Sequence, residues 1–196
     1  MFQNLQLRKA VAEVDQGFYL KCFLSDKWSL PFDLNLHNSN LDQEEYINQK
    51  IYSQYPDLIR LIVYEQSTLR KIGFGNILIE DHSIKRCSLN GGVDPDLLAK
   101  GYGSVGLYLS LKYIFLEMKM NKVTCQVYSF NVPSFKLLES AGFQLDGILR
   151  QHAFNYLTQE FVDVKIYSLL KHEFMGSRIY QTFKILNFQK ILCQEN

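Results

Sequence analysis

Cysteine and histidine are scarce in the sequence, and neither is clustered. Four cysteines and four histidines are scattered over 196 residues, with no CxxC or HExxH motif. A structural zinc site needs several such ligands at close spacing, so we expect no metal site. Isolated cysteines within apolar stretches are typical of reduced thiols that pack as small hydrophobic groups. This use of cysteine predicts a reducing, cytoplasmic environment.

An excess of charge of either sign is also missing. Lysine and arginine number 21, aspartate and glutamate 20, and the net charge is +1. Nucleic-acid binding depends on basic side chains that neutralise phosphates, so we expect no nucleic-acid partner. The apolar runs are far shorter than the roughly 20 residues of a membrane span. The segment from Met1 to Lys9 also lacks the apolar core of a signal peptide, and we expect no membrane contact.

The composition that remains is that of a folded domain, with 47% apolar and 14% aromatic residues. Segments with helical spacing alternate with strand-like segments in the order β-α-α-β-β-β-α-β-α-β-β, which predicts one mixed α/β domain. Strands are expected at 5–9, 58–64, 71–79, 85–93, 122–128, 143–153 and 160–170, and helices at 14–24, 41–52, 104–118 and 131–140. Residues 25–41 are expected to form a long loop. Gly91-Gly92 predicts a bulge or a close approach of another backbone or a ligand.

The most informative segment follows the expected strand that ends at Val93. Its sequence, VDPDLLAKGYGS, leads from that strand into an amphipathic helix. Gly101 and Gly103 leave room for a ligand next to the backbone, and successive N–H groups at a helix N-terminus favour an anion such as phosphate. The segment has neither the Walker motif nor the third glycine of a dinucleotide fingerprint. Taken alone, it is equally compatible with a plain glycine turn.

Three motifs in order resemble the GNAT superfamily of acyl-CoA-dependent N-acetyltransferases. VDPDLLAKGYGS is similar to the family pattern V-x-P-x-x-R-G-x-G-x-G, and NVPSFKLLESAGF to its N-x-x-S/A helix that closes on GF. The likeness continues through DGILRQH, FVDV and YSLL, in the manner of the branch of ribosomal-protein alanine, spermidine and nucleotide-amino-sugar N-acetyltransferases. It implies an α/β GNAT fold, with a mixed central sheet (an antiparallel meander plus a parallel pair) flanked by helices. We expect this domain at 1–174, followed by a C-terminal extension at 175–196.

The resemblance implies acetyl-CoA as cosubstrate and places its site. Backbone amides of the glycine turn would hold the CoA pyrophosphate, and a bulged strand ending at Val93 would bind the pantetheine and polarise the thioester carbonyl. Asn131 would hold the pantetheine arm, cap the following helix, or do both. The expected cofactor-binding residues are Val93, Leu98, Lys100, Gly101, Tyr102, Gly103, Ser104 and Asn131. Leu98 replaces the family's usual Arg or Gln, a loss of charge that Lys100 would partly replace.

The catalytic groups of the family are only partly present in this sequence. The tyrosine that many relatives use to protonate the leaving thiolate falls at Leu138, and in the alanine-acetylating branch that role resembles one of Ser134. Alternatively, Ser134 bonds only the backbone of the first helical turn. The glutamate that relatives use as a base falls at Ala153. Its neighbour His152 has a suitable intrinsic pKa, or is a surface or packed histidine. For the acceptor we expect Trp28, Phe32 and Glu80 as binding residues.

The activity implied is transfer of acetyl to a primary amine by direct attack in a ternary complex. The acceptor would be a protein N-terminus, a polyamine or an amino-sugar nucleotide. The departures at Leu98, Leu138 and Ala153 keep another class open, namely a catalytically silent GNAT domain that binds CoA or a partner. The apolar residues of 175–196 either pack on their own domain or form a homodimer contact.

Overall fold

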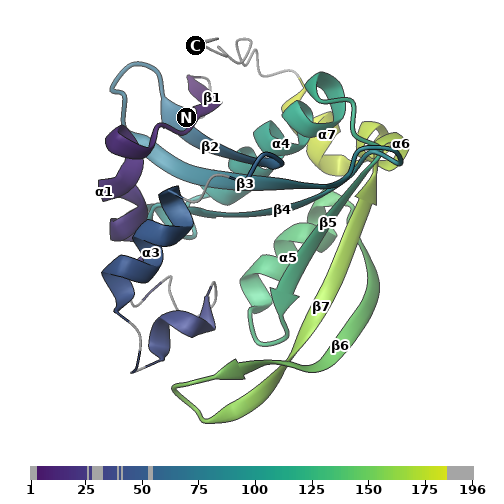
Figure 1. Ribbon diagram of the computed structural model, residues 1–196. Helices are drawn as coiled ribbons and strands as arrows, with labels where there is room; N and C mark the ends of the chain where they lie inside the picture. Colours follow the sequence, from purple (N-terminus) through teal and green to yellow (C-terminus); the bar gives the residue numbers. More distant parts are fainter. Residues whose placement is uncertain are drawn as a thin grey trace.

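A seven-stranded mixed sheet forms the centre of the computed structural model (Figure 1). The structure describes residues 4–25, 27, 33–38, 40, 42–52 and 55–184. The strand order is β1-β2-β3-β4-β5-β7-β6, in which β4 and β5 run parallel and the other neighbours antiparallel. The strands are β1 (Leu5–Lys9), β2 (Leu58–Glu65), β3 (Lys71–Asp81), β4 (Arg86–Val93), β5 (Lys122–Tyr128), β6 (Gln144–Asn155) and β7 (Glu160–Leu170). This arrangement confirms the predicted fold class, a meander joined to a parallel pair.

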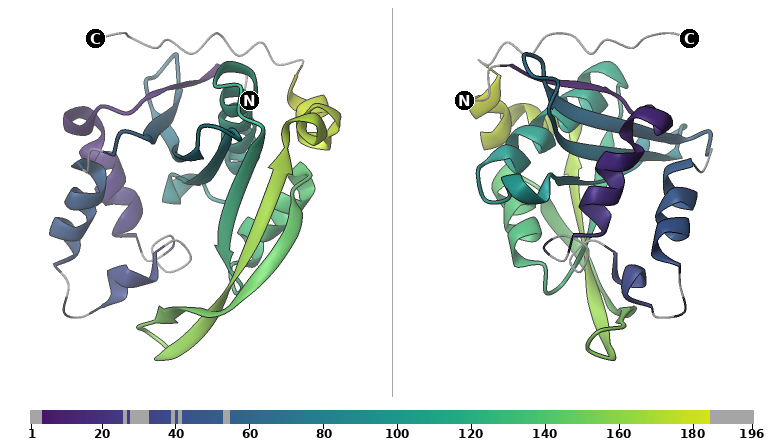
Figure 2. Two further views of the ribbon diagram at one scale, coloured as in Figure 1. Left: turned by 45° about the vertical axis from the view of Figure 1, so that its right-hand side comes forward. Right: turned by 90° about the vertical axis from the view of Figure 1, so that its left-hand side faces the viewer.

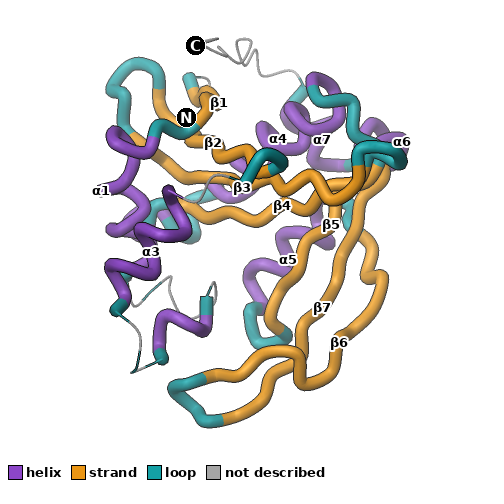
Figure 3. The backbone as a smooth tube through the Cα atoms, in the orientation of Figure 1, coloured by secondary structure: helices purple, strands orange, loops and turns teal. Residues whose placement is uncertain are grey.

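Helices cover both faces of the sheet (Figures 2 and 3). One face carries α1 (Ala12–Phe23), the 3-10 turn η1 (Leu34–His37) and α3 (Gln43–Tyr52). The other face carries α4, α5, α6 and α7, which span Tyr102–Lys112, Val132–Ala141, Lys171–Gly176 and Arg178–Phe183. A π-helical stretch, η3 (Tyr113–Glu117), prolongs α4. None of the helices in the described ranges is long and apolar enough to cross a membrane.

Alternation along the strands divides the core between these two faces. In β2, Leu61 and Val63 belong to the larger cluster under α4, whereas Ile62 belongs to the smaller cluster under α1 and α3. Phe18, Tyr19 and Phe23 of α1 are buried in the smaller cluster. The sheet therefore has one helical layer on each of its two faces.

The glycine pair of β4 is regular strand, so the predicted bulge is wrong. The β3–β4 register runs without a shift from Gly73↔Val93 to Ile79↔Cys87, and the shift in this pair falls between Ile79 and Asp81. A Cβ on Gly91 would lie 2.4 Å from the carbonyl oxygen of Phe74, a backbone contact that no side chain tolerates. The close approach that requires glycine here is made by β3.

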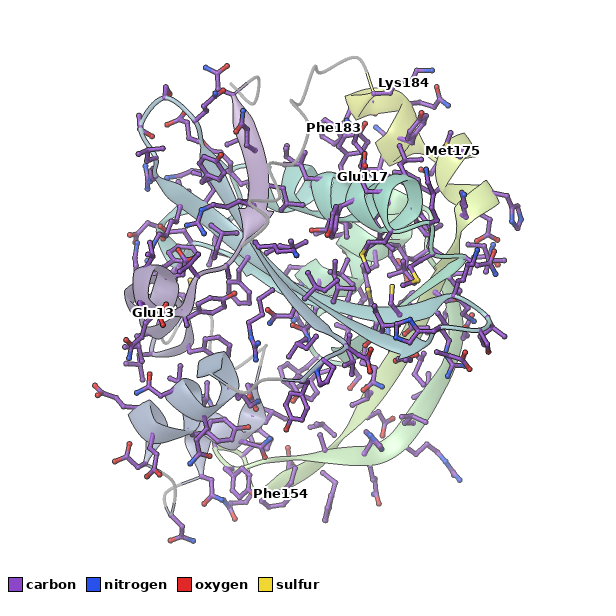
Figure 4. All side chains as sticks on the ribbon, turned by 45° about the horizontal axis from the view of Figure 1, so that its top comes forward. Glu13, Glu117, Phe154, Met175, Phe183 and Lys184 are labelled. Atoms are coloured by element: carbon purple, nitrogen blue, oxygen red, sulfur yellow. The ribbon has the colours of Figure 1, made fainter. Side chains whose placement is uncertain are left out.

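The C-terminal segment contains two helices that the sequence pattern did not predict. Ile179 of α7 is buried, and Tyr180 and Phe183 pack against the larger cluster. Figure 4 shows Phe183 and Lys184 at the end of the molecule opposite Phe154, which lies on the hairpin of β6 and β7. The expected domain boundary at 174 falls inside α6. Residues 185–196 lie outside the described part of the chain, so an extension there stays a prediction.

Candidate functional site

The site begins where the parallel pair of strands separates. Ladder pairing between β4 and β5 covers three residue pairs and ends at Ser88↔Thr124. Beyond it, β4 continues beside β3 to Val93, while β5 continues beside β7 to Tyr128. The two strands diverge as they run, as Figure 1 shows. The last residues of β4 thus have a strand neighbour on one side only.

Backbone groups of β4 point into this separation. The Asp94 N–H donates to the Ile72 carbonyl of β3 at 2.8 Å. Because alternate residues of a strand direct their backbone groups to opposite neighbours, the N–H and C=O of Gly91 and Val93 point toward the β5 side. The Leu89 N–H also points there, and it meets the Cys125 sulfur. Gly91 and Val93 consequently direct backbone donors and acceptors toward the space between β4 and β5, and the role predicted for Val93 in binding pantetheine stays a prediction.

The glycine turn follows directly and starts α4. Gly101 and Ala99 take left-handed backbone conformations, with φ of 83° and 60°. Gly101 is the N-cap of α4 and, having no side chain, gives no side-chain cap to the first turn, which contains Tyr102, Gly103 and Ser104. The N–H groups of an uncapped first turn and the helix dipole together favour an anion. Phosphate binding by this turn stays a prediction.

Two side chains of the turn are placed differently from a cationic phosphate clamp. Leu98 is exposed at the surface of the turn. Lys100 directs its Nζ to the backbone carbonyl of Asp96, 2.9 Å away, and closes the short 3-10 turn η2 (Pro95–Leu97). In this conformation Lys100 caps η2 and does not take the place of the family's arginine.

The middle of α5 lies beside the start of α4. A Cβ on Gly103 would lie 3.5 Å from Leu137 and 3.8 Å from Val93, so these residues are neighbours. The Asn131 side chain caps α5 by accepting from the Ser134 N–H at 3.3 Å, which confirms its capping role. Ser134 is half-buried, one turn before Leu137 and on the same side of α5. Within the described residues, no hydrogen bond involves its hydroxyl.

The structure does not bring the other expected residues to this corner. Glu80 pairs with Arg86 at 2.9 Å, at the end of β4 about 23 Å from Val93 by strand length. His152 is exposed in a bulge of β6, between the paired residues Leu149 and Ala153. Trp28 and Phe32 lie outside the described residues. Leu138 is buried in the larger core cluster, so this position holds no proton donor.

The bulge of β6 is held by Asp163 of β7. Its carboxylate accepts from the Gln151 N–H at 2.8 Å, and Gln151 has a φ of 49°. Bulges of this kind turn neighbouring side chains out of strand alternation. Strand alternation alone is thus a poor guide to where His152 points.

The buried thiols are unsuited to nucleophilic chemistry. Cys22, Cys87 and Cys125 are free and buried. Burial raises the pKa of Cys87 to about 12, and it raises the pKa of Cys125 as well. Thiols are reactive as thiolates, so neither is a candidate for a covalent acyl intermediate. Among the described residues, no group of histidine, cysteine and carboxylate side chains could hold a metal.

On the α3 side of the separation lies a polar cluster that sequence reasoning missed. Asp33 is buried, pairs with Lys50 and accepts from the Tyr46 hydroxyl at 3.2 Å. Burial raises the pKa of Tyr128 at the end of β5, and the nearby backbone of Leu34 opposes this rise. This cluster joins α3 and η1 to β5. No sequence signal identifies it, because its members come together only in the folded chain.

Comparison with known proteins finds relatives that are named N-acetyltransferases. An N-acetyltransferase of uncharacterised function from Bacillus licheniformis, p20, is 28% identical over 117 residues, which cover 60% of this chain and 65% of p20. The uncharacterised N-acetyltransferase YoaA of Bacillus subtilis is 23% identical over 83% of this chain and 92% of its own.

Among solved structures, a chimera of the spermidine N-acetyltransferase SpeG from Vibrio cholerae and hSSAT has the same fold. It superposes with a TM-score of 0.71 at 18% identity, covering 88% of this chain and 99% of the chimera. The model of the acetyltransferase (GNAT) domain matches residues 4–144. The matched residues include the separated strands β4 and β5 and the glycine turn. The chain therefore belongs to the GNAT acetyltransferase family.

Proposed function

We propose that this protein transfers an acetyl group from acetyl-CoA to a primary amine. The observation that carries the proposal is the open backbone edge of Gly91 and Val93 next to the uncapped first turn of α4. The pantetheine arm of acetyl-CoA, which carries the thioester at one end and the pyrophosphate at the other, fits this combination. It needs backbone hydrogen bonds along the arm and an anion site at the phosphate end. Bound acetyl-CoA would supply the acetyl group as a thioester.

In the proposed reaction the chain holds and polarises the reacting groups. The backbone N–H groups at Gly91 and Val93 would hold the pantetheine and stabilise the negative charge that develops on the carbonyl oxygen. Amine attack on that carbonyl forms a C–N bond and breaks the C–S bond. Ser134 would give its hydroxyl proton to the leaving sulfur. The amine would lose one proton to a solvent molecule, and solvent would return one proton to Ser134. An α-amino group, with a pKa of about 7.7–8.0, is partly neutral already.

Ligand-induced stabilisation tests the cosubstrate. At about 100 times its dissociation constant, acetyl-CoA should stabilise the fold by about 2.7 kcal/mol, which raises the melting temperature by several degrees. Thermal unfolding with and without acetyl-CoA measures this shift, with AMP as a control for unspecific nucleotide binding. An unchanged melting temperature at millimolar acetyl-CoA would contradict the proposal.

Replacement of Ser134 tests the acid. Because its hydroxyl has no partner in the described residues, Ser134→Ala should leave the melting temperature within about 1 °C of the native one. Loss of a general acid should lower kcat about 100-fold with little change in KM. Thiol release measured with saturating acetyl-CoA gives both constants. Native turnover in this variant would leave Ser134 with a structural role only.

A polyamine is the acceptor that a specific observation favours. Asp42, Glu44 and Glu45, together with Asn48 and Gln49, line one open depression at the start of α3. The fold is also that of SpeG, whose solved forms are named spermidine N-acetyltransferases. A panel of spermidine, N-terminal peptides and amino-sugar nucleotides, read by thiol release, separates these acceptors. Without release from any amine, CoA binding alone would indicate the catalytically silent module.

The remaining expectations belong to this proposal. His152 would act as the base only if the bulge of β6 turns it toward the acceptor, a point that a His152→Gln variant tests through the pH dependence of kcat.

A cytoplasmic location agrees with the free thiols of Cys22, Cys87 and Cys125. A homodimer would have to form through surfaces other than the part of α7 that packs in the core.

A further inference from the structure

One lysine of α1 joins the two helical layers at the glycine turn. The Lys21 ammonium lies 2.7 Å and 2.9 Å from the two carboxylate oxygens of Asp94, and 2.8 Å from the Asp96 carboxylate. Lys21 and Asp94 are 73 positions apart in the sequence, and Asp94 directly precedes the segment that leads to the turn amides. We propose that Lys21 is a positioning residue that holds the turn in its cofactor-binding shape through Asp94.

Asp94 is the residue through which this effect would pass. Its N–H donates to Ile72 of β3, and its carboxylate accepts from the Asp96 N–H at 2.9 Å, which starts η2. Only 3% of Asp94 is exposed. Four residues after η2, Gly101 starts α4. The direction in which the chain leaves β4 toward the turn is thus set by the carboxylate of Asp94.

The charge of Lys21 is what makes this arrangement stable. A buried carboxylate without a cation is strongly unfavourable, and the described residues give Asp94 no other cationic partner. The hydrogen bond to Asp94 raises the pKa of Lys21, so its ammonium stays charged over the physiological range. Without this cation, the buried charge would be relieved by movement of Asp94 toward water or by protonation of its carboxylate, and either change weakens the hold of Asp94 on the turn.

The anchor on the other side is rigid. Phe18, Cys22 and Phe23 of the same helix are buried against Phe74 of β3. Gln16 of α1 also hydrogen-bonds Asn48 of α3 at 2.8 Å. Lys21 therefore extends from a helix that is fixed against the sheet, which allows it to hold the turn. A movement of α1 would therefore shift the turn through the Lys21 side chain.

The experiment compares Lys21→Met with Lys21→Arg, and it rests on the proposed binding of CoA. Methionine keeps the apolar stem of lysine and removes the charge, whereas arginine keeps the charge. Lys122→Met is the matched control, because Lys122 pairs with Asp146 at 2.8 Å near the other end of β4. Calorimetric titration with CoA gives the dissociation constant, and hydrogen exchange of the ligand-free proteins reports on the amides of 98–104.

The inference predicts a specific pattern. Lys21→Met should weaken CoA binding about tenfold and speed the exchange of the 98–104 amides in the free protein, while Lys21→Arg stays within about twofold of native. Lys122→Met should lose stability without either change. Faster exchange in the free protein separates positioning from a direct contact of Lys21 with phosphate, which would leave the free turn unchanged.

Two results would overturn the inference, and they differ from failure of the proposed function. Native CoA affinity together with native exchange at 98–104 in Lys21→Met would show that Asp94 holds the turn alone. Equal weakening in Lys122→Met would show a general effect of lower stability. If the native protein itself binds no CoA, the proposed function fails, and the inference fails with it.

Discussion

Asn131 is a residue in which a structural and a functional role share one side chain. Its carboxamide oxygen accepts from the Ser134 N–H and caps α5. Its amide nitrogen is the group that would hold the pantetheine arm. Because the two roles use different atoms, substitution can separate them.

Asn131→Ser is the variant that does so. Serine keeps a capping oxygen and adds no charge, so the melting temperature should stay near the native one. It removes the amide, and the loss of one hydrogen bond should raise KM for acetyl-CoA about two- to tenfold. Asn131→Ala should show the same rise and lose about 1 kcal/mol of stability as well. A native KM in the serine variant would reduce Asn131 to a helix cap.

At the scale of the element, α4 contains two glycines with different expected roles. Gly103 lies in the first turn, where the backbone would approach phosphate, and Gly106 lies one turn further on beside Val63. A Cβ at either position would make contacts of 3.5 Å or longer, which is ordinary van der Waals distance. The fold should therefore accept alanine at both places, and only the ligand would discriminate between them.

Gly103→Ala and Gly106→Ala form a matched pair for this test. Each should stabilise the free protein by up to about 1 kcal/mol, the helix-propensity difference between alanine and glycine. Gly103→Ala should weaken CoA binding at least about tenfold, because its methyl group enters the space of the ligand. Gly106→Ala should bind CoA as the native protein does. Equal affinities would mean that phosphate does not approach the first turn of α4.

Sequence reasoning reached those elements whose signal is local. The caps at Asn131 and Gly142, with its φ of 100°, could be recognised because capping residues act on adjacent turns. The Lys21–Asp94 pair could not, since it joins positions 73 apart. Gly91 was assigned to a bulge or a close approach, and only the β3 register shows which of the two is real.

The sequence pattern does not predict the C-terminal helices α6 and α7, for a different reason. Six residues, as in α7, give fewer than two turns, too few for a helical period to stand out. Its apolar residues are there because they complete the core under α4: Tyr108 of α4 packs on Tyr180 and Phe183, with ring centroids 6.4 Å and 5.5 Å apart. Tertiary packing, rather than local propensity, makes this segment helical.

For the whole molecule, this packing makes α7, which follows residue 174, a part of the domain core. Ile179 is 5% exposed within the cluster that also contains the buried residues of α4 and β5. Ile179→Ala should therefore cost about 2–5 kcal/mol of unfolding free energy, through lost burial and the cavity left behind.

Denaturant unfolding measures this loss, and Met175→Ala is the control, since Met175 is 40% exposed and should cost less than about 1 kcal/mol. Because α7 supports the helix that begins at the glycine turn, the Ile179 variant should also bind CoA more weakly at temperatures near its own midpoint. Far below that midpoint its CoA affinity should equal that of the native protein, since no residue of α7 lies in the turn. Native stability in Ile179→Ala would mean that α7 is dispensable, and that the domain ends at 174 as first expected.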